Sequence, residues 1–122
     1  MKNTNAIGLD KEKSEKLAEK LNGLLANYSV FYQNSRGLHW NIKSEKFFEL
    51  HVKFEELYND LLLKIDEVAE RILTLGYAPE HTYSQYNKTS AITESAKITD
   101  GLKAVEQILG SFKTVISLQR EL

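Results

Sequence analysis

Two histidines and two carboxylates have the types and spacing of a metal site. His39 and His51 flank a short polar connector between two amphipathic stretches, so their imidazoles can approach each other. Neutral imidazole is the commonest metal ligand. Asp66 and Glu70 are four residues apart and share one helix face, where like charges repel by about a few tenths of a kcal/mol unless a cation lies between them. We predict these four residues as metal ligands, with Glu55, four residues after His51, as a fifth.

The other acidic residues of the second stretch look like ordinary solvated charges. Three of them have a basic residue four positions further on, in the pairs Glu49 and Lys53, Asp60 and Lys64, and Glu67 and Arg71. Glu56 and Asp60 are also two acidic residues four positions apart, so this spacing alone does not prove a metal site. The alternative is a plain helical interaction module, in which the histidines and carboxylates pair only with each other.

Helix geometry places the candidate ligands on two chains. His51 and Asp66 are fifteen residues apart, hence roughly 22 Å at about 1.5 Å per residue, too far to share one ion. Two copies of this helix, packed antiparallel about a two-fold axis near residues 58–61, would bring the ligands at one end of each copy close to those at the other end of its partner, so the same site would form twice. One chain would then provide His39, His51 and Glu55, and the other Asp66 and Glu70. Imidazole and carboxylate together suit iron, zinc or manganese, and an oxygen-rich set with open positions favours iron.

Composition limits the remaining possibilities. The 122 residues and 14.0 kDa fit a single domain, residues 1–122. Without cysteine the chain forms neither a disulfide nor a thiolate metal site. The net charge of −1 lacks the basic excess of a duplex-binding protein. Charges interrupt every apolar stretch, so we expect a cytoplasmic protein without a membrane segment.

Apolar periodicity predicts an all-α fold. We expect an N-terminal tail (1–9), a first helix (10–40), a second helix (44–75), a crossover with a short helix (76–98) and a third long helix (99–122). A short connector makes the first two helices antiparallel. The predicted buried face of the third long helix consists of Leu102, Val105, Leu109, Phe112 and Ile116.

Several motifs in order resemble the Dps family of ferritin-like mini-ferritins. They are Gly37-Leu38-His39-Trp40-Asn41, Phe47-Phe48-Glu49-Leu50-His51, Phe54-Glu55-Glu56-Leu57-Tyr58 and Asp66-Glu67-Val68-Ala69-Glu70-Arg71. This resemblance covers most of the chain. It implies a ferritin-like antiparallel helical bundle.

The same resemblance implies a ferroxidase. Such a protein oxidises ferrous iron with hydrogen peroxide or dioxygen, stores ferric iron and protects against peroxide stress, as a homododecamer built from two-fold dimers. His39 and His51 would be ligands from one chain, and Asp66 and Glu70 from its two-fold mate. Glu55 matches a further acidic position, and Trp40 a tryptophan near the centre. Zinc is expected as a competing metal.

Two departures from the family pattern lead to further expectations. A fourth long helix has no counterpart after Leu122, so we expect the bundle to lack it. The stretch Met1–Glu12 has only Lys2 and Lys11, so DNA binding is expected to be weak or absent. The second alternative function, a DNA-compacting structural protein, would show salt-dependent affinity. His81, in the loop after Pro79, is expected to be solvated rather than a ligand.

Overall fold

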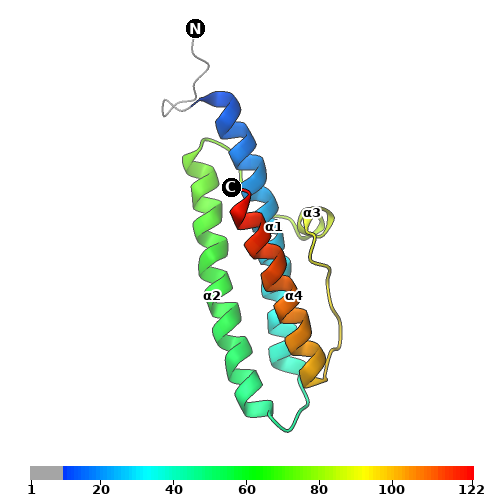
Figure 1. Cartoon of the computed structure of the whole chain (residues 1–122). Coiled ribbons are helices and arrows are strands. Elements are labelled where there is room, and N and C mark those ends of the chain that lie inside the picture. The colour runs from blue at the N-terminus through cyan, green and yellow to red at the C-terminus, as the bar shows by residue number, and fades with distance from the viewer. Residues whose placement is uncertain (1–9) are drawn as a thin grey trace.

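The computed structural model describes residues 10–122, and the expected tail at residues 1–9 lies outside them. The described residues are all-helical in their regular structure, with α1 (Lys11–Asn41), α2 (Phe47–Thr74), the short α3 (Tyr83–Thr89) and α4 (Gly101–Arg120). In Figure 1 the three long helices lie side by side, with α1 antiparallel to both α2 and α4. The segment from Gly76 to Asp100, which carries α3, crosses from the end of α2 back to the start of α4.

The expectation of a missing fourth helix is not supported, because the described part of the chain contains four helices. Three are long and α3 has seven residues. The third long helix was expected to reach residue 122, but α4 ends at Arg120 and Glu121 is its C-cap.

Local side chains explain where the helices begin and end. Asp10 and Asp100 cap α1 and α4, because their carboxylates accept the backbone N–H of Lys13 and Lys103, each at 2.9 Å. After α2 the chain turns at Gly76, whose φ of +90° lies in the left-handed region that glycine adopts without a Cβ penalty.

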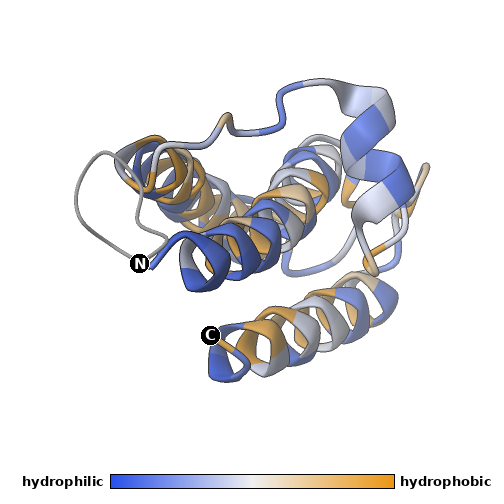
Figure 2. Cartoon of the chain, turned by 90° about the horizontal axis from the view of Figure 1, so that it is seen from above, coloured by the Kyte–Doolittle hydropathy of each residue, from blue (hydrophilic) through white to orange (hydrophobic). Residues whose placement is uncertain are grey.

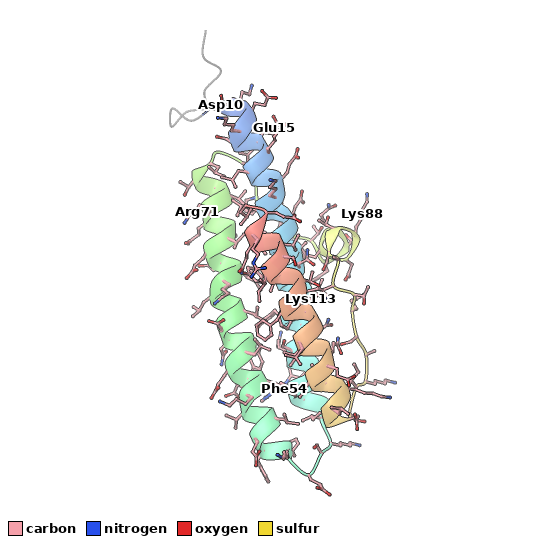
Figure 3. All side chains as sticks on the ribbon, viewed as in Figure 1. Asp10, Glu15, Phe54, Arg71, Lys88 and Lys113 are labelled. Atoms are coloured by element: carbon pink, nitrogen blue, oxygen red, sulfur yellow. The ribbon has the colours of Figure 1, made fainter. Side chains whose placement is uncertain are left out.

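The core lies where α2 and α4 pack on the central α1. Figure 2 shows apolar residues concentrated where the helices face one another. One cluster joins Leu24, Phe31 and Leu38 of α1 to Phe54 of α2, which Figure 3 labels, and to Ile108 of α4. A second cluster lies nearer the start of α1 and consists of Ala18, Leu21, Leu25, Ile72 and Leu75. None of the helices between residues 10 and 122 is long and apolar enough to cross a membrane.

The predicted buried face of α4 is wrong. Leu102, Val105, Leu109, Phe112 and Ile116 are all exposed in the described chain. The buried residues of this helix are Ala104, Ile108, Ser111 and Val115, one helical position away. This second row has smaller side chains, which let α4 approach the large residues of α1 closely. Phe112 still touches Phe31 edge-on, at 5.2 Å between ring centroids.

Asparagines on α1 hold the crossover segment in place. Asn27 is buried, and its side-chain oxygen accepts the backbone N–H of Ala91 at 3.0 Å and of Ile92 at 3.1 Å, and also the Ser90 hydroxyl. Asn34 accepts the backbone N–H of Ser95 at 3.0 Å and donates its side-chain N–H to the Thr93 carbonyl at 2.9 Å. Because buried backbone groups need partners, these amides fix a segment that has little regular structure of its own.

Candidate metal centre

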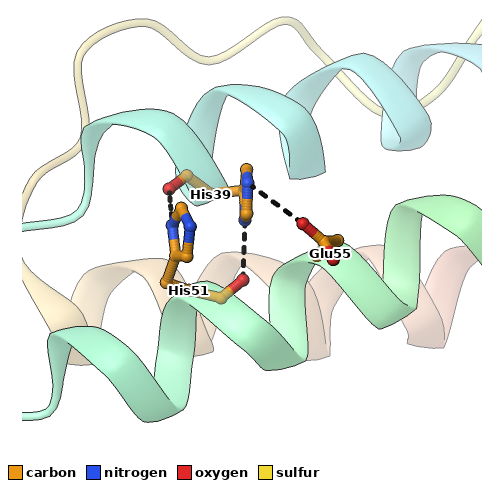
Figure 4. Close-up of polar contacts among 3 residues, drawn as sticks. All are labelled: His39, His51 and Glu55. Carbon is orange, nitrogen blue, oxygen red and sulfur yellow. Dashed lines mark hydrogen bonds and ion pairs between the residues drawn. The ribbon is translucent and has the colours of Figure 1, made fainter.

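The two histidines meet at the turn that joins α1 to α2. His39 lies in the last turn of α1 and is buried, and His51 lies in the second turn of α2 and is half-buried. Their rings stack with centroids 3.6 Å apart and an interplanar angle of 18°. The short connector 42–46 therefore brings together two imidazoles that are twelve residues apart in sequence, as Figure 4 shows.

Each imidazole is fixed by the backbone of the other histidine. His39 Nδ1 lies 2.6 Å from the His51 carbonyl oxygen, and His51 Nδ1 lies 2.8 Å from the His39 carbonyl oxygen (Figure 4). The His39 carbonyl is available because α1 ends here and the backbone N–H of Lys43 donates instead to Thr99. A carbonyl oxygen only accepts hydrogen bonds, so we assign the ring proton to Nδ1 in both histidines. Both Nε2 lone pairs are then free to bind a metal.

Aromatic neighbours hold this stacked pair from both sides. Phe47 stacks on the ring of His51 with centroids 5.0 Å apart, and Tyr58 meets His39 edge-on at 5.3 Å. Ring packing of this kind, together with the two hydrogen bonds, restricts rotation of both imidazoles. The donor atoms are therefore held in place before any ion arrives.

Glu55 is the only predicted carboxylate ligand that this chain brings to its own histidines. Its Oε1 lies 3.7 Å from His39 Nε2, beyond hydrogen-bond distance, and its side chain is 52% exposed (Figure 4). The Glu55 carboxylate and the His39 imidazole thus face the same space without a hydrogen bond between them. A cation in that space would contact a neutral nitrogen donor and a charged oxygen donor.

Asp66 and Glu70 lie further along α2 and are exposed. Eleven residues separate Glu55 from Asp66, which is roughly 16 Å at about 1.5 Å per residue. Neither carboxylate forms an ion pair within residues 10–122. Across the same residues, no three histidine or acidic side chains of one chain are grouped closely enough to hold a metal. One chain therefore brings His39 and His51 together, with the Glu55 carboxylate beside His39 alone, and leaves Asp66 and Glu70 apart from them.

The ion pairs predicted on α2 are only partly correct. Lys64 pairs with Asp60 at 2.7 Å as predicted, and this hydrogen bond raises the pKa of the Lys64 amine above its ordinary value of 10.5. Lys53 pairs with Glu56 at 3.3 Å instead of Glu49. A lysine reaches residues three or four positions away with similar ease, so helical spacing alone does not decide between them.

The exposed face of α2 carries a regular row of residues that includes two of the candidate ligands. Its positions alternate in steps of four and three, and all but the half-buried Ala69 are exposed; they are Phe48, Val52, Glu55, Asn59, Leu62, Asp66, Ala69 and Leu73. Phe48 is 81% exposed and Leu73 is 59% exposed. An exposed apolar row at this spacing is typical of a helix that packs on another helix.

Trp40 and His81, two further residues considered from the sequence, are not part of the histidine pair. Trp40 is 56% exposed, and the Arg36 guanidinium lies over its ring at 4.8 Å. His81 is exposed in the loop before α3 and makes only a local contact, from Nδ1 to the Pro79 carbonyl at 3.3 Å. Sequence reasoning missed the contact of Tyr58 with His39. The signal was available, because Tyr58 lies seven residues after His51 and so near the same helix face.

Comparisons with known proteins agree with the resemblance found in the sequence. Residues 18–122 match the family described as Ferritin-like domain. The chain is 37% identical over 113 residues to the DNA protection during starvation protein of Porphyromonas gingivalis, covering 93% of this chain and 71% of the relative.

Solved structures give the same relationship. A Dps protein from Vibrio cholerae O1, described as a member of the ferritin-like diiron-carboxylate superfamily, superposes with a TM-score of 0.95 at 52% identity, covering 99% of this chain and 76% of the other. Dps from Staphylococcus aureus gives a TM-score of 0.84 at 36% identity, covering 88% and 72%.

Proposed function

The chain belongs to the ferritin-like Dps family, and from this premise we propose that it is a ferroxidase that oxidises ferrous iron and stores the ferric product. Iron is the substrate and cargo of the proposed reaction, and hydrogen peroxide or dioxygen is the oxidant. We propose a centre shared by two chains across a two-fold axis, a homododecameric shell, and the cytoplasm as the compartment. Consumption of ferrous iron together with peroxide would protect the cell from oxidative damage.

The observation that carries the shared centre is the symmetry of the exposed row on α2. Its positions pair about a midpoint between residues 60 and 61: Phe48 with Leu73, Val52 with Ala69, Glu55 with Asp66 and Asn59 with Leu62. Two copies packed antiparallel about this midpoint would place apolar residues opposite apolar residues at both ends. A face that complements itself in this way suits an isologous two-fold contact.

The same register supplies the missing ligands. Glu55 would lie opposite the partner's Asp66, and His51 opposite the partner's Glu70. Each of the two sites would then combine two Nε2 donors with three carboxylates. Carboxylates favour the ferric product, because they are hard anionic donors.

The proposed reaction is a two-electron reduction of peroxide. Two ferrous ions lose one electron each, and peroxide takes up both electrons and two protons to leave as two water molecules. Paired sites avoid the release of a one-electron radical, since both electrons reach the oxidant together. Zinc would occupy the same nitrogen donors without redox chemistry and is proposed as an inhibitor.

The test is removal of the two carboxylates that a partner would supply. We expect the double variant Asp66→Asn and Glu70→Gln to lose rapid iron oxidation, followed by ferric absorbance in stopped-flow mixing with peroxide, while its helical circular dichroism is unchanged. Glu67→Gln is the matched control, because it removes a neighbouring exposed carboxylate of α2 that lies outside the row. Unchanged kinetics in the double variant would contradict the site.

A mixed assembly tests the sharing between chains directly. A His39→Ala chain lacks one set of ligands, and the Asp66→Asn and Glu70→Gln chain lacks the other. If one centre draws on two chains, a refolded mixture regains activity, because a fraction of its dimers contains one complete site. If each centre belonged to a single chain, the mixture would stay as inactive as its components.

A further inference from the structure

The α4 helix carries a row of large apolar side chains that stays exposed within residues 10–122. Its members, here called the α4 row, follow one another in steps of three and four; they are Leu102, Val105, Leu109, Phe112 and Ile116. Leu102 is 68% exposed and Leu109 is 62% exposed. The row lies beside the residues of α4 that are buried against α1. Apolar residues at this spacing are typical of a helix face that packs on another helix.

The arrangement of the three long helices leaves this side of α4 open. In Figure 1, α4 lies along α1 and not along α2. An open hollow of about 370 Å³ lies between α2 and α4, and its apolar lining consists of Phe54 and Leu57 of α2 and Ile108 and Phe112 of α4. Phe112 belongs to both the α4 row and the hollow. The uncovered apolar surface therefore extends from α4 toward α2.

The α4 row complements a second copy of itself. Its positions are nearly symmetric about Leu109. In a copy of α4 that runs antiparallel about that residue, Leu102 would meet Ile116, and Val105 would meet Phe112. Apolar residues would then lie opposite apolar residues over the fourteen positions from 102 to 116, which is roughly 21 Å at about 1.5 Å per residue. Such a face suits an isologous two-fold contact.

The charges beside the α4 row match the same arrangement. Glu106 and Lys113 lie along one edge of the row and are exposed, and neither forms an ion pair in the part of the chain that the structure describes. An antiparallel copy would place Glu106 opposite Lys113 of the second copy, and the two-fold axis would repeat this pair. A parallel copy would instead place each of these residues level with its own counterpart. Opposite charges at the rim therefore favour the antiparallel direction and fix its register.

We propose that the α4 row binds the α4 row of a second copy of this chain, antiparallel about Leu109. This inference does not rest on the proposed ferroxidase function. The contact is separate from the two-fold contact proposed through α2, because the two rows lie on different helices. A chain with two isologous faces associates through both of them.

Cross-linking tests the contact directly, because the chain contains no cysteine of its own. The full chain carrying Leu109→Cys is oxidised in dilute solution and examined on a non-reducing gel. We expect most of it as a disulfide-linked dimer, since a residue at the axis lies opposite its own copy and a disulfide requires Cα atoms within about 7 Å. Lys103→Cys is the matched control, exposed on another side of α4, and should link about tenfold less. Equal yields would overturn the proposal.

Mixed chains test the direction of the two helices. Glu106→Cys and Lys113→Cys chains, one of them enlarged by a tag, are oxidised separately and together. We expect a product that contains one chain of each kind and little linkage of either chain to itself. Linkage of Glu106→Cys to itself, in place of the mixed product, would show a parallel contact and overturn the proposal.

Reversal of one charge tests the pairing at the rim. In the Leu109→Cys chain, Glu106→Lys places a lysine opposite Lys113, so the yield of dimer should fall about tenfold. Adding Lys113→Glu should restore the yield, which a general disturbance of the fold would not do. Lys103→Glu is the control outside the row, and circular dichroism checks the helices of every variant. A yield that is unchanged by Glu106→Lys, or not restored by Lys113→Glu, would contradict the proposal.

Two further chains separate this contact from other arrangements. Leu62→Asp, which is directed at the contact through α2, should leave the Leu109→Cys yield unchanged. A fall as large as that caused by Glu106→Lys would mean that the link forms only within an assembly held by α2. Preferred linkage of Leu109→Cys to a Leu57→Cys chain would mean that the α4 row covers the hollow of another copy instead. Either result would overturn the proposal and leave the ferroxidase function untouched.

Discussion

We predict that the Asn27 side chain contributes to the stability of the folded chain by attaching the crossover segment to α1. Asn27→Ala removes the acceptor for two backbone N–H groups, those of Ala91 and Ile92, although the buried Ile92 N–H keeps the Ser90 hydroxyl as an acceptor at 3.0 Å. An unsatisfied buried N–H costs about 1–3 kcal/mol. Alanine regains about 0.5 kcal/mol through its higher helix propensity. The weaker loss at Ile92 roughly offsets this gain, so we expect the free energy of unfolding to fall by about 1–3 kcal/mol, mainly from the Ala91 N–H.

Asn41 provides a control with the same local bond. Asn27 donates its side-chain N–H to the Gly23 carbonyl at 2.8 Å, and Asn41 donates to the Gly37 carbonyl at 2.9 Å, also four residues back. Asn41 is exposed and makes no bond to the crossover. Asn41→Ala should change stability by no more than about 0.5 kcal/mol. The difference between the two variants measures the attachment of the crossover alone.

Two measurements check this expectation. Urea unfolding is compared at one protein concentration, because association between chains contributes to apparent stability. Hydrogen exchange should show the amide of Ala91 exchanging about tenfold faster in Asn27→Ala, since about 1.4 kcal/mol corresponds to a factor of ten, with a smaller increase at Ile92, which keeps the Ser90 hydroxyl. Equal losses of stability in the two variants, or unchanged exchange at residues 91 and 92, would refute the reasoning.

Three other predictions follow from single contacts. Gly76→Ala should destabilise the chain by about 1–2 kcal/mol in urea unfolding, because alanine is strained in the left-handed backbone conformation at φ +90°. Gly110→Ala, in open space on α4, should instead stabilise the chain by about 0.5–1 kcal/mol. A gain in stability in Gly76→Ala would contradict this reasoning. Asp60→Asn should lower the pKa of Lys64 toward its ordinary value, because it removes the largest cause of the rise, and NMR titration of the amine would follow the change. Because the pKa of Lys64 is raised in the folded chain, the stability contributed by the Lys64–Asp60 pair is fully present below pH 10.5 and is lost as pH rises through the folded pKa. A loss of this contribution on acidification down to neutral pH would refute the prediction. Leu62→Asp, near the proposed two-fold axis and 48% exposed, should leave the single chain folded but reduce its association in light scattering, and an unchanged native mass would contradict the proposed interface.

The sequence by itself determined the helices and the kinds of ligand. Periodicity, the capping residues Asp10 and Asp100 and the stop at Gly76 act within a few residues, so they can be read directly from neighbouring positions. The connector between His39 and His51 is too short to do anything but bring them to one end of the helix pair. Helix rise also settled that Asp66 lies far from His51 on the same chain.

Only the tertiary structure decided which face of α4 is buried. Two neighbouring rows of this helix contain apolar residues, and the row with the larger side chains was the natural prediction. Ala104 and Ser111 allow a closer approach to α1, so packing selected the row with smaller side chains. Such a choice depends on the shape of the opposite surface, which no local pattern in the sequence contains.

The fixed orientation of the histidines and the attachment of the crossover are likewise tertiary. Each imidazole is held by a carbonyl on the other helix, and Asn27 bonds to groups 63 to 65 residues away. Residue type shows that such groups can form hydrogen bonds but not with which partner, because the partners meet only when the helices have packed. The sequence therefore determined which atoms are available for metal chemistry, and the packing of α1 against α2 decided which of them remain free.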